Sequence, residues 1–207
     1  MTQPFITRDR LADIKASLSR KPRAWHTYDK HIKPMMRQAA LDREHLYDFT
    51  VVYLSILYHD IVYSTDITYH QLNEKQSTQI FREDWFTLNI SNDQFFAVQA
   101  FILATISHKV DSILHSLPEP YHNDLKYFLD LDILIFSQPF IKVLEFDSLI
   151  REEFSHIDDR EYYPARLEII KKFAERPAIY VSDRFKHLNP VAKDNLEKLS
   201  VLLSLHV

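Results

Sequence analysis

An adjacent histidine and aspartate, His59 and Asp60, end an apolar stretch of the chain. The pair offers one divalent ion a neutral imidazole nitrogen and a hard anionic oxygen, a mixture that suits Mn, Fe, Ni, Co or Zn. His31, His108 and Asp132 lie at intervals that can bring them around the same ion. The first hypothesis is therefore a metal site that performs hydrolysis.

The elements that must position these side chains are predicted to be helices. Apolar residues recur three or four apart over residues 46 to 61, the spacing of a buried helical face, and the His-Asp pair lies at the end of this segment. A capping box at Ser91 predicts another helix that extends toward His108 and places it near the last turn. Pro34 is expected to kink or divide a helix over residues 23–42, and Pro118 and Pro120 mark a loop. The remaining helices are predicted over residues 7–20, 69–87, 123–136, 139–156, 163–176 and 190–205.

Glycine and cysteine are both absent from the 207 residues. An average chain of this length has about 14 glycines, so tight hairpins that need a positive φ are disfavoured. No segment shows the alternation of a strand. Without cysteine the chain has neither disulfides nor thiolate ligands, which is compatible with a reducing cytoplasm. The sequence therefore predicts one all-α domain over residues 1–207.

Charge and hydropathy argue against two classes of partner. The formal net charge is -4, and no Lys/Arg-rich tract offers a surface for the phosphates of a long nucleic acid. The N-terminus lacks a basic region followed by an apolar core. The longest apolar stretch, residues 51 to 58, is far shorter than the roughly 20 residues that span a bilayer. We therefore expect a soluble, unexported, cytoplasmic protein without a membrane partner, whose exposed helix faces would support a homodimer.

The combination of candidate ligands counts for more than any one of them. A single member of the 11 histidines is about four times more often a surface or capping residue than a ligand. Helix bundles, however, build metal sites from inward-facing side chains of separate helices. Two imidazoles and two carboxylates hold a divalent ion and leave open positions for water and a phosphate oxygen. His108 can be a further ligand, or it can hold the scissile phosphate or protonate the leaving group, which is the favoured role.

Several short groups of residues follow one another in an order typical of a known family. The first are Trp25-His26, His31-Ile32, Tyr58-His59-Asp60-Ile61-Val62-Tyr63, Asn73-Glu74 with Ser77, Thr105 with His108, and Phe128-Leu129-Asp130-Leu131-Asp132. The later ones are Ile150-Arg151-Glu152-Glu153-Phe154, Tyr163 with Arg166, Arg176 with Ile179-Tyr180, and Asn195-Leu196. Over nearly its whole length the chain resembles the HD superfamily, and more closely its small, predicted metal-dependent phosphohydrolases.

The resemblance implies a single-domain HD-type helical bundle that binds one divalent ion, whether Mn, Ni, Co, Fe, Mg or Zn. The ligands that it implies are His31, His59, Asp60 and Asp132. The choice of Asp132 follows the family's use of the aspartate just before the next aliphatic residue of the helix. Asp130 is two positions away, about 200° around a helix, so we expect it to be solvated or to cap the backbone.

The sequence departs from the family pattern at two positions. Family members commonly have a histidine four residues before the one that matches His31, but here that position is Thr27 and the nearby histidine is His26. In a regular helix a five-residue offset turns His26 by about 140° from His31. Ala165 replaces a glycine that usually precedes the matching Arg166.

Three further residues have a functional and a structural interpretation. Glu74 either orients a metal-bound water or a ligand histidine, or it faces solvent, and the sequence favours neither. Arg151 and Arg166 can each clamp a phosphate through two nitrogens of the guanidinium. Structural ion pairs, to partners such as Asp159, are ranked ahead for both arginines because clustered acidic residues lie close in sequence.

The resemblance implies hydrolysis of a phosphate ester or phosphoanhydride of a small molecule, such as a nucleotide. In that mechanism a metal-activated water attacks phosphorus, Asp60 accepts a hydrogen bond from the water, and His108 stabilises or protonates the leaving oxygen. One alternative is a sensor or partner-binding module that binds a nucleotide or metal without turnover. An iron-dependent oxygenase is a weaker alternative, because a second set of metal ligands is not evident.

Overall fold

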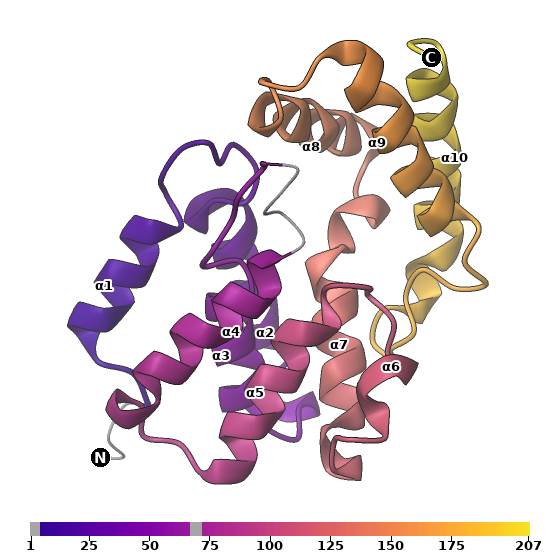
Figure 1. Ribbon diagram of the computed structural model, residues 1–207. Coiled ribbons are helices and arrows are strands. Elements are labelled where there is room, and N and C mark those ends of the chain that lie inside the picture. Colours follow the sequence, from indigo (N-terminus) through magenta and orange to yellow (C-terminus); the bar gives the residue numbers. More distant parts are fainter. Residues whose placement is uncertain (1–4, 67–71) are drawn as a thin grey trace. The chain divides into compact units, whose positions relative to one another are not determined.

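The computed structural model describes residues 5–66 and 72–207, and this part of the chain is built from helices without a strand (Figure 1). The all-α prediction is thereby confirmed. The chain divides into two compact units, Met1–Leu129 and Asp130–Val207, which are described separately. The prediction of one domain over residues 1–207 stays a prediction.

The first unit holds the longer series of helices. Its α-helices are α1 (Arg8–Ser17), α2 (Lys33–Leu41), α3 (Phe49–Tyr58), α4 (Asn73–Asp84), α5 (Asn92–Ala104), α6 (Asp111–Leu114) and most of α7 (His122–Asp132). A π-helical turn, Tyr28–Ile32, precedes α2, and 3₁₀ turns cover Arg43–His45, Trp85–Thr87 and Glu119–Tyr121. In the described residues no helix combines the length and the apolar character needed to cross a membrane.

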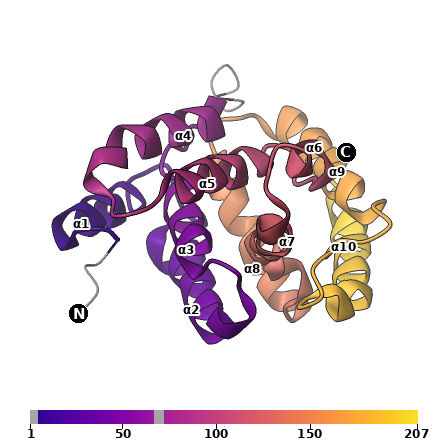
Figure 2. The same ribbon diagram turned by 90° about the horizontal axis from the view of Figure 1, so that it is seen from below.

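Helix α3 is the buried centre of the first unit. It packs against α2, α4 and α5, which surround it in Figures 1 and 2. Its buried residues are Val51, Val52, Leu54, Ser55, Ile56, Leu57 and Tyr58. A helix that is apolar on nearly all sides is stable only when other elements cover it. The segment that leads into His59 and Asp60 is therefore held rigidly by the core.

Two carboxylates fix the beginning of α3. Asp48 caps the helix, because its Oδ1 accepts from the backbone N–H of Thr50 at 2.9 Å and of Val51 at 3.2 Å. The Asp124 carboxylate in turn accepts from the N–H of Tyr47 at 3.0 Å and of Asp48 at 2.7 Å. Burial raises the pKa of Asp124, although these backbone bonds lower it in part. The cap therefore connects the start of α3 to the first turn of α7.

A third carboxylate fixes the other end of α3. The Tyr58 hydroxyl donates to Asp84 Oδ2 at 2.6 Å, and the Arg10 guanidinium donates to the same oxygen at 2.6 Å. Burial and the Asp84 hydrogen bond both raise the pKa of Tyr58 far above its usual value, so the phenol stays protonated. Helices α1, α3 and α4 are thus linked one residue before His59.

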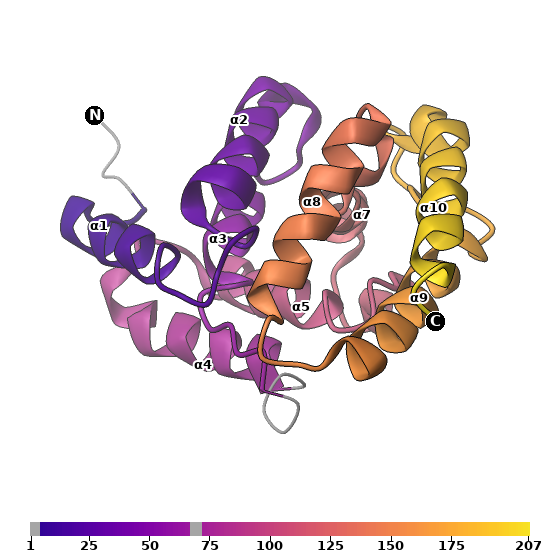
Figure 3. The same ribbon diagram turned by 90° about the horizontal axis from the view of Figure 1, so that it is seen from above.

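The second unit contains three longer helices. They are α8 (Phe140–Glu153), α9 (Asp159–Ala174) and α10 (Asn189–Ser204), with 3₁₀ turns at Leu134–Ser137 and Lys186–Leu188. Helix α10 packs along α9 and also contacts α8 (Figure 3). The Asn195 amide donates to the carbonyls of Phe136 and Gln138 at 2.7 and 2.8 Å, which holds the chain before α8 against α10.

The observed helix boundaries differ from the predicted ones where local chemistry intervenes. The helix predicted over residues 23–42 is a loop, a π-helical turn and then α2, with Pro34 in the first turn of α2, directly after the change from π-helix to α-helix. Helix α5 ends at Ala104, so the prediction that His108 lies near its last turn is wrong. Helix α9 begins earlier than predicted because Asp158 caps it at the N–H of Arg160. The helix predicted over residues 69–87 has its first residues outside the described part of the chain, and the rest is observed as α4 with a 3₁₀ turn after it.

The Asp48 cap generates the first prediction. Replacing Asp48 with Ala should lower the free energy of unfolding by about 1 to 2 kcal/mol, because two backbone N–H groups lose their acceptor. Urea denaturation followed by circular dichroism measures this change. Asp48→Asn keeps a side-chain oxygen at the cap and should lose less. Equal losses in the two variants would contradict the capping role.

Candidate metal centre

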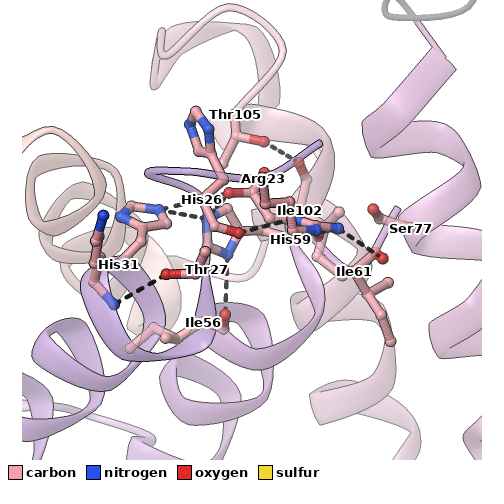
Figure 4. A network of polar contacts seen from close by, with 12 residues as sticks. Arg23, His26, Thr27, His31, Ile56, His59, Ile61, Ser77, Ile102 and Thr105 are labelled. Carbon is pink, nitrogen blue, oxygen red and sulfur yellow. Dashed lines mark hydrogen bonds and ion pairs between the residues drawn. The ribbon is translucent and has the colours of Figure 1, made fainter. Parts of the chain in front are cut away.

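His31, His59 and Asp60 bring three ligand atoms to one place. His31 Nε2 lies 3.2 Å from His59 Nε2, and Asp60 Oδ2 lies 3.3 Å from His59 Nε2 and 3.6 Å from His31 Nε2. The two histidines are 4% and 2% exposed. His31 comes from the π-helical turn, whereas His59 follows directly after α3, and the two rings meet edge to face with their centres 5.3 Å apart (Figure 4). These side chains therefore converge from two different elements.

The hydrogen bonding of His59 determines which of its nitrogens is free to bind a metal. Its Nδ1 lies 3.0 Å from the carbonyl oxygen of Ile56, which can only accept, so Nδ1 carries the hydrogen. In the neutral ring Nε2 then has a lone pair, 3.3 Å from Asp60 Oδ2, which is an acceptor when ionised. Two such acceptors repel unless a proton or a metal ion lies between them. This donor set fits a divalent ion, and a carbonyl bond of this kind is how ligand histidines are commonly oriented.

Asp132 belongs to the same group of candidate ligands. His31, His59 and Asp132 each offer one ligand atom, and these atoms all lie within 4.8 Å of one another. Helix α7 already contacts the site one turn earlier, where the ring of Phe128 lies edge-on to His59 at 5.6 Å. Residues four apart share a helix face, so Asp132 follows Phe128 on that face. The group of two buried histidines and an aspartate can hold a metal ion.

The environment of Asp60 favours its charged form. Burial alone would raise the pKa of this carboxyl, but the charge and hydrogen bond of His59, with the charges of His26 and His31, lower it overall. The side chain is 19% exposed, so it is partly accessible to solvent. Asp60 is therefore an anionic candidate ligand that water can reach.

His26 lies close to the site, although a regular helix would turn it away. The Thr27 backbone is extended and caps the π-helical turn, so the helical angle between His26 and His31 does not apply. The turn closes over five residues, from the carbonyl of Thr27 to the N–H of Ile32 at 3.3 Å. The rings of His26 and His31 lie 5.5 Å apart, edge to face (Figure 4). The extended backbone at Thr27 and the π-helical turn thus bring His26 and His31 together, although a regular helix would separate them.

Asn73 and Ser77 of α4 hold the segment that follows Asp60. The Asn73 amide accepts from the N–H of Ser64 at 2.9 Å and donates to its carbonyl at 3.0 Å. The Ser77 hydroxyl accepts from the N–H of Val62 at 3.1 Å. These two side chains therefore hold the backbone of the segment after Asp60 in place through hydrogen bonds.

Glu74 and His108 lie within electrostatic range of each other. Burial raises the pKa of Glu74, as does the charge of Asp60, while the charges of His108 and His59 lower it in part. His108 has a φ of 49°, and its N–H donates to the carbonyl of Ala104 at 3.0 Å. A chain without glycine must place another residue at such a left-handed position, and histidine is among the residue types that tolerate it. The prediction that Glu74 and His108 act in catalysis stays a prediction.

The other aspartate of the motif, Asp130, has a structural role in the second unit. Its carboxylate accepts from the backbone N–H of Val181 at 3.0 Å and of Ser182 at 2.7 Å. Burial raises the pKa of Asp130, and these bonds lower it in part. Asp130 thus caps backbone, which is one of the two roles expected for it, and it is buried and not solvated.

Arg151 forms the ion pair with Asp159 that was ranked ahead, and Arg166 is also ion-paired, although to Asp147, which the sequence did not predict as its partner. Arg151 donates to Asp159 Oδ1 at 2.7 Å and to the carbonyls of Phe154 and Ile157 at 2.6 and 3.0 Å. Arg166 Nε donates to Asp147 Oδ1 at 2.8 Å, while its buried Nη2 has no hydrogen-bond partner. Their predicted binding of phosphate stays a prediction.

Arg23 contacts the site but was not among the predicted site residues. Its guanidinium donates to the carbonyls of Asp60 and Ile61, which immediately follow His59. The sequence shows only that Arg23 lies three residues before His26. Because the residue lies in a loop, no regular spacing predicts which groups it contacts.

No model of a known protein family, no curated protein and no solved structure matches the chain. The likeness to the HD superfamily therefore rests on the quoted residues and stays a resemblance.

The site predicts stabilisation by a divalent ion. An ion present at about 100 times its Kd adds about 2.7 kcal/mol to the stability of the folded state. In a chain of this size such a gain raises the Tm by roughly 5 to 10 °C. We expect this shift in the wild type and its loss in His59→Ala, measured by calorimetry with Mn, Co, Ni and Zn in turn. His187→Ala, which removes an exposed histidine of the 3₁₀ turn before α10, should keep it. A full shift in His59→Ala would contradict the site.

Proposed function

We propose that the protein is a metal-dependent phosphohydrolase of the HD type, which cleaves a phosphate ester or phosphoanhydride of a small molecule. The observation that carries the proposal is the convergence of His31, His59 and Asp60, whose ligand atoms lie within 3.6 Å of one another. Asp132 completes a mixed set of imidazole and carboxylate ligands. Such a set keeps a hard divalent ion electrophilic, as phosphate chemistry requires.

The chain's own residues have separable roles in this proposal. A divalent ion, when bound, supplies a Lewis acid for a phosphoryl oxygen and an activated water. Asp60 accepts a hydrogen bond from the attacking water, and its exposed edge admits that water. Glu74, at the start of α4 and within the field of Asp60, orients the water or takes up its proton. The oxygen of the water bonds to phosphorus as the bond from phosphorus to the leaving oxygen breaks.

His108 is proposed to give a proton to the leaving oxygen. It lies on the segment after α5, within range of the Glu74 carboxylate. The donated proton neutralises the alkoxide that forms as the ester bond breaks, so the products are an alcohol and phosphate. A left-handed backbone at His108 costs energy, and strained residues of this kind occur often at functional positions.

Burial of both histidine ligands favours a second candidate, a module that senses a metal or nucleotide without turnover. Structural metal sites are closed, whereas catalytic sites keep an open position. His31 and His59 are nearly inaccessible, so the open position depends on the Asp60 side of the site. The substrate class is a further prediction for the hydrolase. A cytoplasmic location and a homodimer are predictions that accompany either candidate.

Turnover with a panel of substrates tests the proposal directly. Purified protein should release phosphate from at least one nucleotide or phosphomonoester when Mn, Ni, Co, Fe, Mg or Zn is added. Asp60→Asn should reduce kcat by about 100-fold or more, because the ligand loses its charge while its shape is kept. His187→Gln serves as the control. Full activity in Asp60→Asn would contradict the mechanism, and stoichiometric metal without any turnover would favour the sensor.

The role of His108 can be tested through the leaving group. His108→Gln should slow hydrolysis of an alkyl phosphate by about 100-fold or more, the usual contribution of a general acid. A nitrophenyl phosphate, whose leaving group needs no proton, should be slowed far less. The ratio of the two effects is the measurement. Equal losses on both substrates would assign His108 to positioning or phosphate binding.

A further inference from the structure

The Arg23 guanidinium joins the two segments that carry the candidate ligands. Its Nη2 donates to the carbonyl of Asp60 at 2.6 Å and to the carbonyl of Ile61 at 3.1 Å. Its Nη1 donates to the carbonyl of His26 at 3.0 Å. One side chain therefore bridges the chain that leaves α3 and the chain that enters the π-helical turn, and Figure 4 shows it reaching across to Ile61.

Aromatic rings support this guanidinium from one side. Arg23 lies over the ring of Tyr63, 5.1 Å from its centre, and the same ring packs against His26 at 4.5 Å. His26 in turn contacts the ring of His31 at 5.5 Å. A chain of contacts therefore leads from the arginine to a ligand ring, in addition to the backbone bonds.

Arginine is suited to this place by its shape. The guanidinium is planar and presents five N–H donors in a fixed fork, so one group can bind several carbonyls at once and stack on a ring. A lysine ammonium keeps the charge but is a compact group on a flexible stem. A guanidinium that holds three carbonyls therefore restricts the backbone at Asp60 and His26 in a way that charge alone does not reproduce.

The bonded carbonyls lie where helical bonding ends. The last carbonyls of a helix and the residues after it have no helical donor, and cationic side chains can satisfy them. Asp60 is two residues beyond the end of α3, so rotation of its peptide would redirect its carboxylate. The His26 carbonyl precedes the extended Thr27 and the turn that carries His31. Both ligand-bearing segments are thus held at backbone positions outside regular helix.

We propose that Arg23 is a positioning residue of the metal centre, which sets metal affinity by fixing Asp60 and His31 relative to each other. The inference rests on the proposed metal site, but it makes a separate claim. Side chains that orient ligands typically contribute about 10- to 100-fold to metal affinity. Loss of the fork should therefore weaken binding even where the charge and the fold are kept.

The test compares the conservative variant Arg23→Lys with the wild type. Competition against a chromophoric chelator gives the Kd for Co and Zn, and the visible absorption of bound Co reports the coordination geometry. We expect Arg23→Lys to weaken binding by about tenfold or more and to alter the Co spectrum. The Tm without metal should stay close to that of the wild type. Arg23→Gln, which also loses the charge, should weaken binding at least as much.

A matched control is Arg43→Lys in the first unit. Arg43 also lies over an aromatic ring, that of Phe49 at 4.8 Å, but at the start of α3 and thus at the other end of that helix from His59. Its replacement should leave both the Co affinity and the Co spectrum unchanged. Unchanged affinity and spectrum in Arg23→Lys, with metal bound by the wild type, would overturn the role of Arg23 alone. Absence of metal binding in the wild type would overturn both this role and the proposed function.

Discussion

The need for positive charge, a proton or a metal ion, between His59 and Asp60 is the constraint on which the site depends. His59 Nε2 and Asp60 Oδ2 lie 3.3 Å apart, and the hydrogen bond to Ile56 commits the other nitrogen of His59 to donation. In a buried setting two such acceptors are stable together only with positive charge between them. The surrounding structure must therefore hold side chains in place that would otherwise separate.

The scaffold meets this requirement through carboxylates at the ends of helices, of which Asp124 is buried and the others partly buried. Asp48 and Asp124 fix the beginning of α3, and Asp84 fixes its end through Tyr58. Each accepts hydrogen bonds from groups that would otherwise be unsatisfied, at the points where helical bonding stops. Because other elements cover α3 on nearly all sides, the helix cannot shift to compensate for a displaced end. Rigidity of the core is thereby passed on to His59 and Asp60.

Much of the fold and the centre of the site follow from sequence, because periodicity and residue type are local properties. The apolar spacing before His59 predicts α3, and the Ser91 box predicts the start of α5. The details that fail are decided by backbone geometry. The end of α5 and the left-handed His108 depend on where a glycine-free chain can turn. The contacts of Arg23 depend on segments 37 residues apart, which no short-range pattern encodes.

The π-helical turn has a consequence for how such sites are found in other sequences. It keeps the rings of His26 and His31 5.5 Å apart although the two histidines are five residues apart in sequence. A search pattern with a fixed helical gap of four residues between two histidines would miss this pair, even though its side chains lie close together. Motif definitions that allow an additional residue at helix starts, and are judged by distances in space, would recover such pairs. The distance between the rings thus identifies the pair more reliably than its spacing in the sequence.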